Sequence, residues 1–403
     1  MKLYLIALGS RGDNEPFRAL ALEAASAGHE VFFAHTSDIA CDPDAPYTDL
    51  ELPGSLEQII AEQGISVMKA LRNYRSVMEP LLRGVWDAST AHIRQLRPDV
   101  VVYHPKVVTA ALAAHSVGAI AAEVEIVPTM TPTEEFSPAG IPPALPASWN
   151  RASYALVRAG MAPFRSMLRR RARELGVIRT ESDLVLCPVS PTLIPQPLDW
   201  PDFAQITGQW SIPSRERLDP GLQEFLDGGR VLYAGFGSMR DRHGLARAQA
   251  IVSAARGLGM RTLLATGWGG LVATPDHMVA PDVWVEKSVP HTALLPHVDV
   301  AIHHGGAGTT HAMIRAGAPS LIMPFLTDQP WWANRLHREG LGPPALSRTT
   351  TNPETISQAV TAALGCSDRL QSAALQMSHE DGLQEALRIL EDAEAGMHSL
   401  RPA

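Results

Sequence analysis

The sequence is poor in cysteine: its 403 residues include three, at Cys41, Cys187 and Cys366. They lie far apart, so they match neither a disulfide framework nor a zinc-binding pattern. The histidines of the C-terminal half lack an HExxH spacing, and phosphate or structural roles suit them better than metal binding. We therefore expect reduced thiols, a cytoplasmic location and no metal ion.

The sequence also lacks an excess of positive charge. It has 34 Lys and Arg residues against 42 Asp and Glu residues, a net charge of −8. General nucleic-acid binding needs basic residues that displace counterions, so we expect no nucleic-acid partner. One basic run, Arg169-Arg170-Arg171-Ala172-Arg173, is interpreted as the solvated face of a helix.

Long apolar runs are absent as well. The N-terminal run Leu3–Leu8 is too short for a signal peptide, and no run approaches the ~20 residues that span a bilayer. We expect no stable membrane insertion and find no evident basic and apolar membrane patch. The sequence has no G-x-S-x-G and no G-x-x-x-x-G-K-[ST] motif, which disfavours triad hydrolases and P-loop nucleotidases.

What the sequence does contain is an alternation of short apolar strands and helices. Apolar residues make up 45% of the chain and charged residues 19%, as in ordinary globular proteins. Strand-helix alternation is typical of parallel sheets covered on both faces. In the first half it predicts strands at Leu3–Leu8, Val31–Ala34, Val100–Tyr103 and Asp183–Cys187, and helices at Pro16–Ala27, Ala110–Val117 and Ser153–Leu175.

The alternation begins again after the proline-rich stretch Pro188–Pro220. Two domains of similar size fit this pattern, and ligands of such sheets bind beyond the carboxyl ends of their strands. The second half predicts strands at Val231–Phe236, Arg261–Ala265, Val283–Glu286, Val300–His303 and Ser320–Met323, and helices at Leu245–Gly257, Ala307–Ala316 and Gly382–Ala393.

The most specific motif is His303-His304-Gly305-Gly306-Ala307-Gly308-Thr309-Thr310-His311. It follows a predicted strand and opens a predicted helix. Glycines let the backbone approach a ligand closely, and a helix start presents unpaired N–H groups and a positive dipole end. We interpret the motif as a diphosphate site, with His304 as the contact because it directly precedes the glycines.

Three further loops follow predicted strands. Asp328 and Gln329, after Ser320–Met323, have donors and acceptors suited to sugar hydroxyls, although a helix-capping turn is the simpler interpretation of the pair alone. Gly9–Asp13 follows the first strand, and Asp13 by itself is better read as a cap than as a base. Gly235–Met239 is the equivalent turn of the second half and offers backbone N–H groups and the Ser238 hydroxyl.

Taken in order, these motifs resemble the GT-B glycosyltransferases that use UDP- or TDP-sugars. The nearest branch joins sterol 3-β-glucosyltransferases with bacterial glycosyltransferases of glycopeptide-antibiotic and other natural-product biosynthesis (family 1). The segments that carry the resemblance are Ser10-Arg11-Gly12-Asp13-x-x-Pro16-Phe17, Val289-Pro290-His291, His304 to Thr310, and Pro324-Phe325-x-x-Asp328-Gln329.

The resemblance implies an α/β protein of the GT-B fold, with two Rossmann-like domains that face each other across a cleft. We expect an acceptor-binding domain at residues 1–195, a linker at 196–220 and a donor-binding domain at 221–385. The remainder, 386–403, is expected to be a helix and tail that cross back to the first domain.

The resemblance also assigns roles to residues. Val289 and His291 are expected at the base and ribose of the donor, and Asp328 and Gln329 at its sugar. The diphosphate is expected at His304, Ala307, Gly308 and Thr309, with Ser10, Arg11, Gly12 and Ser238 completing the donor site. Asp13 is implied as the catalytic base.

The implied reaction is a single displacement with inversion, without a metal or other cofactor. UDP-glucose is the favoured donor, because of the likeness to the sterol branch and the Asp328-Gln329 pair, and a TDP-sugar is second. The acceptor is expected to be a small, largely hydrophobic molecule shaped by Pro53–Arg83 and Val127–Trp149. An unperturbed aspartate is a poor base for an aliphatic alcohol, with a pKa of about 3.9.

Three other functions remain open from the sequence. One is a UDP-sugar epimerase of the same architecture, which would consume donor without acceptor. A second is a transferase acting on a lipid-linked cell-wall intermediate. The third is an inactive homologue that serves as a binding partner. The sequence leaves the oligomeric state undetermined.

Overall fold

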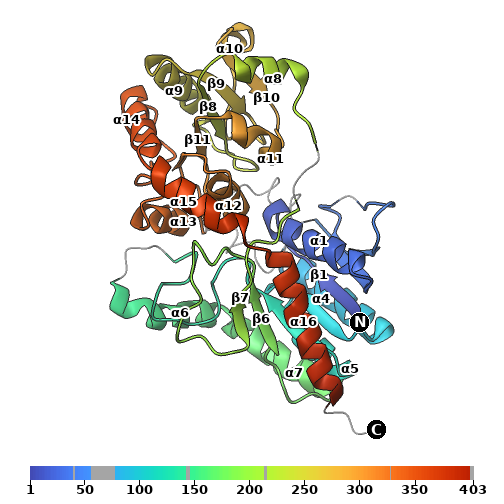
Figure 1. The fold of residues 1–403 in the computed structure, drawn as a ribbon. Coiled ribbons are helices and arrows are strands. Elements are labelled where there is room, and N and C mark those ends of the chain that lie inside the picture. Colours follow the sequence, from blue (N-terminus) through green and yellow to red (C-terminus); the bar gives the residue numbers. More distant parts are fainter. Residues whose placement is uncertain (40, 56–77, 142–145, 213–215, 327, 400–403) are drawn as a thin grey trace. The chain divides into compact units, whose positions relative to one another are not determined.

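The computed structural model describes residues 1–39, 41–55, 78–141, 146–212, 216–326 and 328–399 (Figure 1). The chain divides into two compact units. The first unit comprises Met1–Pro138, Ala147–Ser211 and Asp381–Ala403, and the second comprises Ala139–Pro146 and Ile212–Glu380.

The first unit is built on a parallel sheet in which seven described strands have the order β3-β2-β1-β4-β5-β6-β7. Its central strands are apolar on both faces, as expected where helices cover both sides. The strands are β1 (Lys2–Ile6), β2 (Glu30–Thr36), β3 (Thr48–Leu52), β4 (Val100–Tyr103), β5 (Ile120–Val124), β6 (Leu184–Cys187) and β7 (Ala204–Ile206).

Alternate residues of β1 point to opposite faces of this sheet. Leu3 and Leu5 pack with α1 and α16, while Tyr4 and Ile6 pack with α4, α5 and part of α7. The helices of the first unit are α1 (Arg11–Ser26), α4 (Glu79–Leu96), α5 (Ala110–Val117), η2 (Ala147–Trp149), α6 (Asn150–Gly160), η3 (Ala162–Phe164), α7 (Arg165–Leu175) and α16 (Gly382–Ser399).

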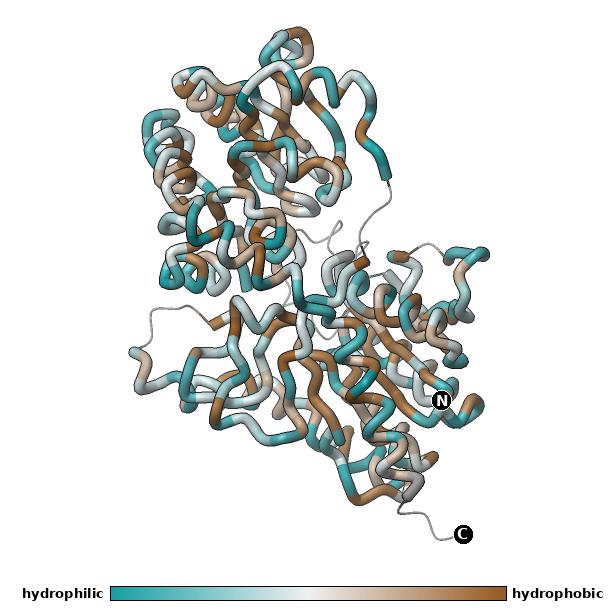
Figure 2. The backbone as a smooth tube through the Cα atoms, in the orientation of Figure 1, coloured by the Kyte–Doolittle hydropathy of each residue, from teal (hydrophilic) through white to brown (hydrophobic). Residues whose placement is uncertain are grey.

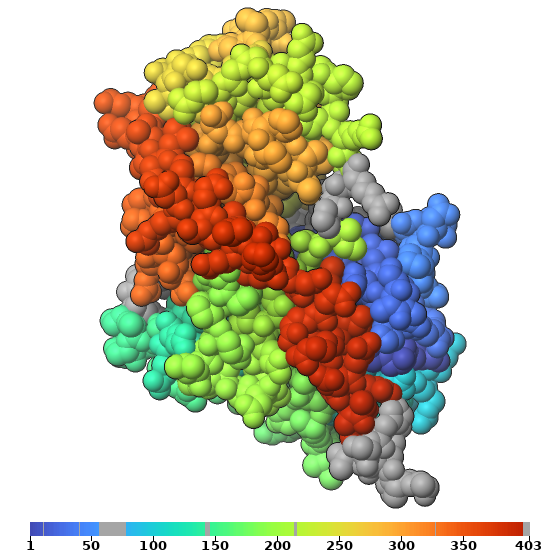
Figure 3. Space-filling model, viewed as in Figure 1, coloured from blue at the N-terminus to red at the C-terminus, as the bar shows by residue number. Residues whose placement is uncertain are grey.

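The C-terminal helix α16 lies along α1 on the surface of the first unit (Figures 1 and 3). Its apolar residues Leu383, Leu387 and Leu390 recur at helical spacing and are buried in the first unit's core. The chain thus returns to its first unit after completing the second.

The second unit holds a parallel sheet of five described strands in the order β10-β9-β8-β11-β12. These strands form the hydrophobic interior of the unit (Figure 2). They are β8 (Val231–Gly235), β9 (Arg261–Ala265), β10 (Val283–Glu286), β11 (Val300–His303) and β12 (Ser320–Ile322).

Helices also cover both faces of this second sheet. Ala234 and Ile302 pack with α9 and α14, whereas Tyr233 and Ala301 pack with α8, α11 and α12. The helices are α8 (Pro220–Asp227), α9 (Gly244–Gly257), α10 (Pro275–Val279), α11 (His291–Leu294), η4 (Leu295–His297), α12 (Ala307–Arg315), α13 (Gln329–Arg338), α14 (Pro353–Leu364) and α15 (Ser367–Ser378).

Each sheet has one place where the strand order reverses direction. In the first unit it lies between β1 and β4, and in the second between β8 and β11. Successive connections leave such a position toward opposite sides of the sheet, so a crevice forms beyond the strand ends. Residues just after β1, β4, β8 and β11 therefore occupy the places where this architecture binds ligands.

Several elements differ from the sequence expectations. The first helix starts at Arg11 and contains Pro16, because Ser10 and Asp13 form a capping box that begins the helix earlier. The helix expected at Ser153–Leu175 is two helices, since Gly160 and Pro163 break it. The stretch 196–220, expected as linker, includes β7, a strand of the first sheet.

Two further findings concern the chain as a whole. Within the described residues, every helix is too short or too polar to traverse a bilayer. Cys41, Cys187 and Cys366 are free thiols, of which Cys187 is buried.

The close approach of α16 to the first unit generates a stability prediction. A Cβ atom at Gly382 would overlap the backbone of Gly208, whereas a Cβ at Gly396 of the same helix meets nothing within 4 Å. We expect Gly382→Ala to destabilise the first unit by about 1–3 kcal/mol, and Gly396→Ala to be neutral or stabilising by up to about 1 kcal/mol. Urea unfolding of both variants tests this, and equal effects would refute the packing.

Candidate functional site

In the first unit, the candidate site forms where β1 and β4 end. Ser10 is the N-cap of α1, and its backbone N–H and hydroxyl donate to Asp13 Oδ2 at 2.7 and 3.0 Å. Gly12, in the first helical turn, is exposed. Asp13 thus acts as the helix cap that the sequence suggested, and its side chain is 25% exposed.

The other carboxylate oxygen of Asp13 faces residues that sequence analysis missed. His104 Nε2 lies 3.3 Å and Lys106 Nζ 3.6 Å from Asp13 Oδ1. His104 Nδ1 accepts a hydrogen bond from the Lys106 backbone N–H at 3.1 Å, which places the ring proton on Nε2. A neutral His104 therefore donates to Asp13.

These contacts set the charge of the cluster. Burial alone acts to raise the pKa of Asp13, but the Lys106 charge, the His104 contact and the Ser10 N–H outweigh it and hold the pKa well below its usual range. Burial, followed by the Lys106 charge, lowers the pKa of His104. At neutral pH the cluster is a carboxylate beside a neutral imidazole and an ammonium group.

In the second unit, the candidate site forms where β8 and β11 end. His303 is fully buried and its Nδ1 accepts from the Gly305 N–H at 3.1 Å, so this histidine stabilises the turn. Gly305 has φ +86°, and a Cβ there would lie 2.6 Å from Ile322 Cγ2. Only glycine fits this position without strain.

His304 lies differently from His303. Its ring is packed over Gly306, and its Cε1 lies 3.6 Å from where a Cβ of Gly237 would stand. The Nδ1 atom of His304 is buried without a hydrogen-bond partner, although buried polar atoms normally have one. Burial, with a smaller effect of the His291 charge, lowers the pKa of His304 to about 4, so the ring is neutral at pH 7.

Helix α12 begins beside His304. The first helical hydrogen bond joins the Thr310 N–H to the Gly306 carbonyl, so the N–H groups of Ala307, Gly308 and Thr309 precede the hydrogen-bonded part of the helix. Gly308 is exposed, and a Cβ there would meet nothing within 4 Å. This open helix N-terminus is suited to an anionic group.

Ser238, Val289 and His291, which were also predicted at the donor, lie in the same unit. Ser238 is partly exposed in the turn after β8. Val289 packs against the core, and His291 starts α11 with its Nε2 3.2 Å from the Tyr233 hydroxyl. Arg11 in the first unit starts α1.

Asp328 and Gln329 differ from each other in exposure. Asp328 is the N-cap residue of α13 and is partly exposed. Gln329 is 4% exposed, and its Oε1 accepts from the N–H groups of Phe325 and Leu326 at 2.7 and 3.1 Å. Gln329 thus fixes the loop that carries Asp328, and its Nε2 lies 3.6 Å from Met239 Sδ.

The two tryptophans that follow are core residues. Trp331 and Trp332 are 4% and 0% exposed, and their rings meet edge to face at 5.1 Å. His311 also packs edge-on against Trp332 at 5.1 Å, and its Nδ1 lies 2.7 Å from the Ala307 carbonyl. These three side chains therefore pack the core of the second unit.

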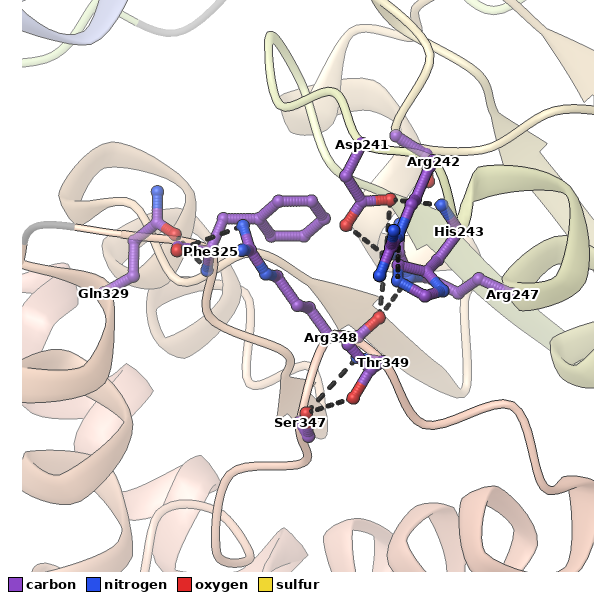
Figure 4. Close-up of polar contacts among 10 residues, drawn as sticks. Asp241, Arg242, His243, Arg247, Phe325, Gln329, Ser347, Arg348 and Thr349 are labelled. Carbon is purple, nitrogen blue, oxygen red and sulfur yellow. Dashed lines mark hydrogen bonds and ion pairs between the residues drawn. The ribbon is translucent and has the colours of Figure 1, made fainter. Parts of the chain in front are cut away.

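A buried arginine ties the loops of the second unit together (Figure 4). Arg247 of α9 is fully buried and forms a two-oxygen ion pair with Asp241 at 2.7 and 2.9 Å. It also donates to the carbonyls of Gly270 and Arg348, and its guanidinium lies 4.9 Å from the Phe325 ring centre. Asp241, Gly270 and Phe325 belong to the loops that follow β8, β9 and β12, and Arg348 lies between α13 and α14.

Sequence analysis missed Arg247 and Asp241. Their signal is a single arginine in the alanine-rich first turn of a helix, six residues after an aspartate. An arginine there is ordinarily exposed, so only the folded structure distinguishes it.

One group of potential metal ligands lies elsewhere in the described part of the first unit. His35, Cys41 and Asp49 have ligand atoms within 4.8 Å of one another. His35 Nε2 lies 2.9 Å from an Asp49 oxygen, so these two side chains already partner each other. His35 is on β2, Asp49 is on β3 and Cys41 lies in the connection between them, away from the strand-order reversal.

Comparisons with known proteins agree with this architecture. Residues 273–385 match the family described as "Erythromycin biosynthesis protein CIII-like, C-terminal domain". Glycosyltransferase GtfE of Amycolatopsis orientalis is 30% identical over 416 residues, covering 93% of each chain. The sterol 3-beta-glucosyltransferase of Emericella nidulans is 28% identical over 382 residues, 85% of this chain but 26% of that longer protein.

Solved structures show the same fold. The calicheamicin glycosyltransferase CalG4 has a TM-score of 0.74 at 17% identity, with 99% of each chain covered. Glycosyltransferase VinC, solved in complex with DTDP, has a TM-score of 0.68 at 18% identity, covering 98% of this chain and 100% of that one.

The two parallel α/β units and these relatives identify the chain as a glycosyltransferase of the GT-B fold. The chain belongs to family 1 of these enzymes, in the branch of natural-product and sterol glycosyltransferases.

The Arg247 network generates the prediction of this subsection. Arg247→Met keeps the approximate length of the side chain but removes the ion-pair partner of Asp241, whose side chain is only 12% exposed. We expect a loss of about 3–5 kcal/mol in unfolding free energy. The unfolding free energy of Arg247→Lys should lie between those of wild type and Arg247→Met, because lysine retains the positive charge but lacks the planar guanidinium group.

A double-mutant cycle provides the control. In an Arg247→Met background, Asp241→Asn should recover part of the lost stability, because it removes the unpaired charge. Strictly additive effects in urea unfolding would show that the ion pair does not couple the loops.

Proposed function

We propose that this enzyme transfers a sugar, with inversion, from a UDP-sugar to a hydroxyl of a small hydrophobic molecule. Glucose is the preferred sugar, and a TDP-sugar is the second choice of donor. The sterol 3-beta-glucosyltransferase relatives favour glucose as the sugar. The complex of VinC with DTDP supports a TDP-sugar as the second candidate donor. The free thiols of the described chain support a cytoplasmic location.

The observation that carries this proposal is the open start of α12 beside His304. The N–H groups of Ala307, Gly308 and Thr309 would bind the diphosphate, and the unpartnered His304 Nδ1 would gain a partner. As the bond to the sugar breaks, negative charge grows on the leaving diphosphate. Fixed N–H donors and the helix dipole stabilise that charge without reorganisation or a metal ion.

The same proposal gives roles to the surrounding loops. Asp328 would bind the sugar hydroxyls together with the amide nitrogen of Gln329. The Oε1 atom of Gln329 holds their loop through the N–H groups of Phe325 and Leu326. Val289 and His291 would hold the base and ribose. Ser238 adds a hydroxyl donor.

Asp13 is proposed as the base, with Ser10, Arg11 and Gly12 around it. Its carboxylate stays ionised, which a base requires, but its low pKa makes it a weak one. Proton transfer must therefore come late, when the attacking hydroxyl has become acidic through bond formation to the sugar. His104 holds the carboxylate in place and is a positioning residue.

Asp13→Asn tests the base. Asn retains an oxygen that accepts from the Ser10 N–H, so α1 should still form, while proton transfer is lost. We expect kcat to fall about 10²–10⁴-fold with little change in donor KM. A kcat within threefold of wild type, in a variant with an unchanged melting temperature, would leave Asp13 as a helix cap alone.

Lys106→Met supplies a pH test of the same residue. Removing the cation 3.6 Å from Asp13 raises the pKa of that carboxyl. The acid limb of the kcat/KM profile of Lys106→Met should therefore lie at higher pH than that of wild type. The control Lys2→Met removes a lysine at the opposite end of β1 and should leave the acid limb unchanged. Identical profiles for all three proteins would contradict the assignment.

His304→Ala tests the donor site. Loss of a hydrogen bond to a charged group, worth about 1.5–3 kcal/mol, should weaken UDP binding roughly 10- to 100-fold. His297→Ala, an exposed histidine of the same unit, is the matched control. Calorimetry with UDP and TDP measures both variants, and unchanged affinity in His304→Ala refutes the diphosphate contact. Donor consumption without any acceptor would indicate the epimerase.

A further inference from the structure

The segment of α6, η3 and α7 is unusual in a chain with a net charge of −8. Residues 150–175 contain seven arginines against a single acidic residue, Glu174. The segment lies on the surface of the first unit (Figure 1). It contains the run that the sequence suggested is a solvated helix face.

The arginines of α7 follow a helical period. Arg165, Arg169 and Arg173 are spaced four residues apart and are all exposed. Together with Arg158 they have no ion-pair partner among the described residues. Like charges at this spacing repel one another and cost a helix a few tenths of a kcal/mol per pair, a cost that an external anion would offset.

An exposed apolar stripe lies on η2 and α6, ahead of α7 in the chain. Trp149, Ala152, Leu156 and Ala159 recur every three or four residues and are all exposed, with Trp149 at 60% and Leu156 at 61%. Large apolar side chains arranged in this way on one helical face usually mark an interaction surface.

The opposite face of α6 is anchored to the first unit. Asn150 donates to the Glu134 carbonyl at 2.9 Å, and the buried Tyr154 hydroxyl lies 3.4 Å from the Phe136 carbonyl. Arg151 pairs with Asp199 at 2.9 Å, and Leu198 beside that aspartate is 97% exposed. The stripe is therefore held outward by specific contacts.

We propose that this basic and apolar surface docks the enzyme on an anionic lipid bilayer. The apolar stripe would enter the boundary between headgroups and acyl chains, and the arginines would form bidentate hydrogen bonds with lipid phosphates. The sequence analysis found no such patch, because the apolar residues line up only when residues 149–159 are helical. The proposal does not depend on the identity of donor or acceptor.

Charge and symmetry favour a bilayer over other partners. Nucleic acid would pair with the arginines but would leave the apolar stripe without a partner. A second copy in a two-fold arrangement would bring arginines against the same arginines. An anionic bilayer satisfies both the charged and the apolar component at once.

The test is co-sedimentation of the full chain with vesicles of phosphatidylcholine alone or mixed with phosphatidylglycerol. We expect binding to the anionic vesicles only, and weakening by added salt. Removing one arginine should weaken binding roughly fivefold, as expected for about 1 kcal/mol per basic residue at such a surface. The affinity of the triple variant Arg165→Gln, Arg169→Gln, Arg173→Gln for anionic vesicles should therefore be about 100-fold lower than that of wild type.

Leu156→Glu tests the apolar component and should weaken binding at least tenfold. Two matched controls should bind as wild type: Arg94→Gln, an exposed arginine of α4, and Leu375→Glu, a 65% exposed leucine of α15. Circular dichroism and melting temperature confirm that each variant folds.

Four results would overturn the proposal. They are equal binding to neutral and anionic vesicles, no vesicle binding at all, full binding by Leu156→Glu or the triple variant, and self-association in sedimentation velocity that Leu156→Glu abolishes. The second result would direct attention to an acidic protein partner, and the fourth to a second copy.

Discussion

The reversal of strand order in each parallel sheet is the constraint on which both candidate sites depend. It places the loops after β1 and β4 next to each other, and likewise those after β8 and β11. Neighbouring loops at such a point leave room for a ligand and direct backbone N–H groups toward it. Asp13 with His104, and Gly237 with His304, are brought together in this way although they are far apart in sequence.

The two sites use opposite electrostatic arrangements. In the first unit, an ammonium group and three hydrogen-bond donors keep Asp13 negatively charged. In the second, burial keeps His304 neutral, and the positive character comes from backbone N–H groups at the α12 start. A fixed dipole binds an anion without carrying a net charge that must be desolvated, which suits a leaving diphosphate.

Sequence predicted what is encoded locally. The strands Val100–Tyr103, Arg261–Ala265 and Val300–His303 are found at their predicted bounds, because a short apolar run between turn residues identifies a buried strand. What it missed depends on contacts distant in the chain. His104 and Arg247 are ordinary polar residues in sequence, and only their burial against Asp13 and Asp241 distinguishes them. Part of the expected acceptor region, 56–77, lies outside the described residues.

The structural role of Asp13 at the start of α1 conflicts with its proposed role as the base. The donors that start α1 are the same groups that lower the basicity of the carboxylate. A stronger base would need fewer donors, and the helix start, with the loop that carries Ser10, would then lose a cap worth about 1 kcal/mol. Of the groups around the carboxylate, Lys106 is the one whose side chain is 45% exposed. If an acceptor displaces its ammonium, the basicity of Asp13 rises only when there is a hydroxyl to deprotonate.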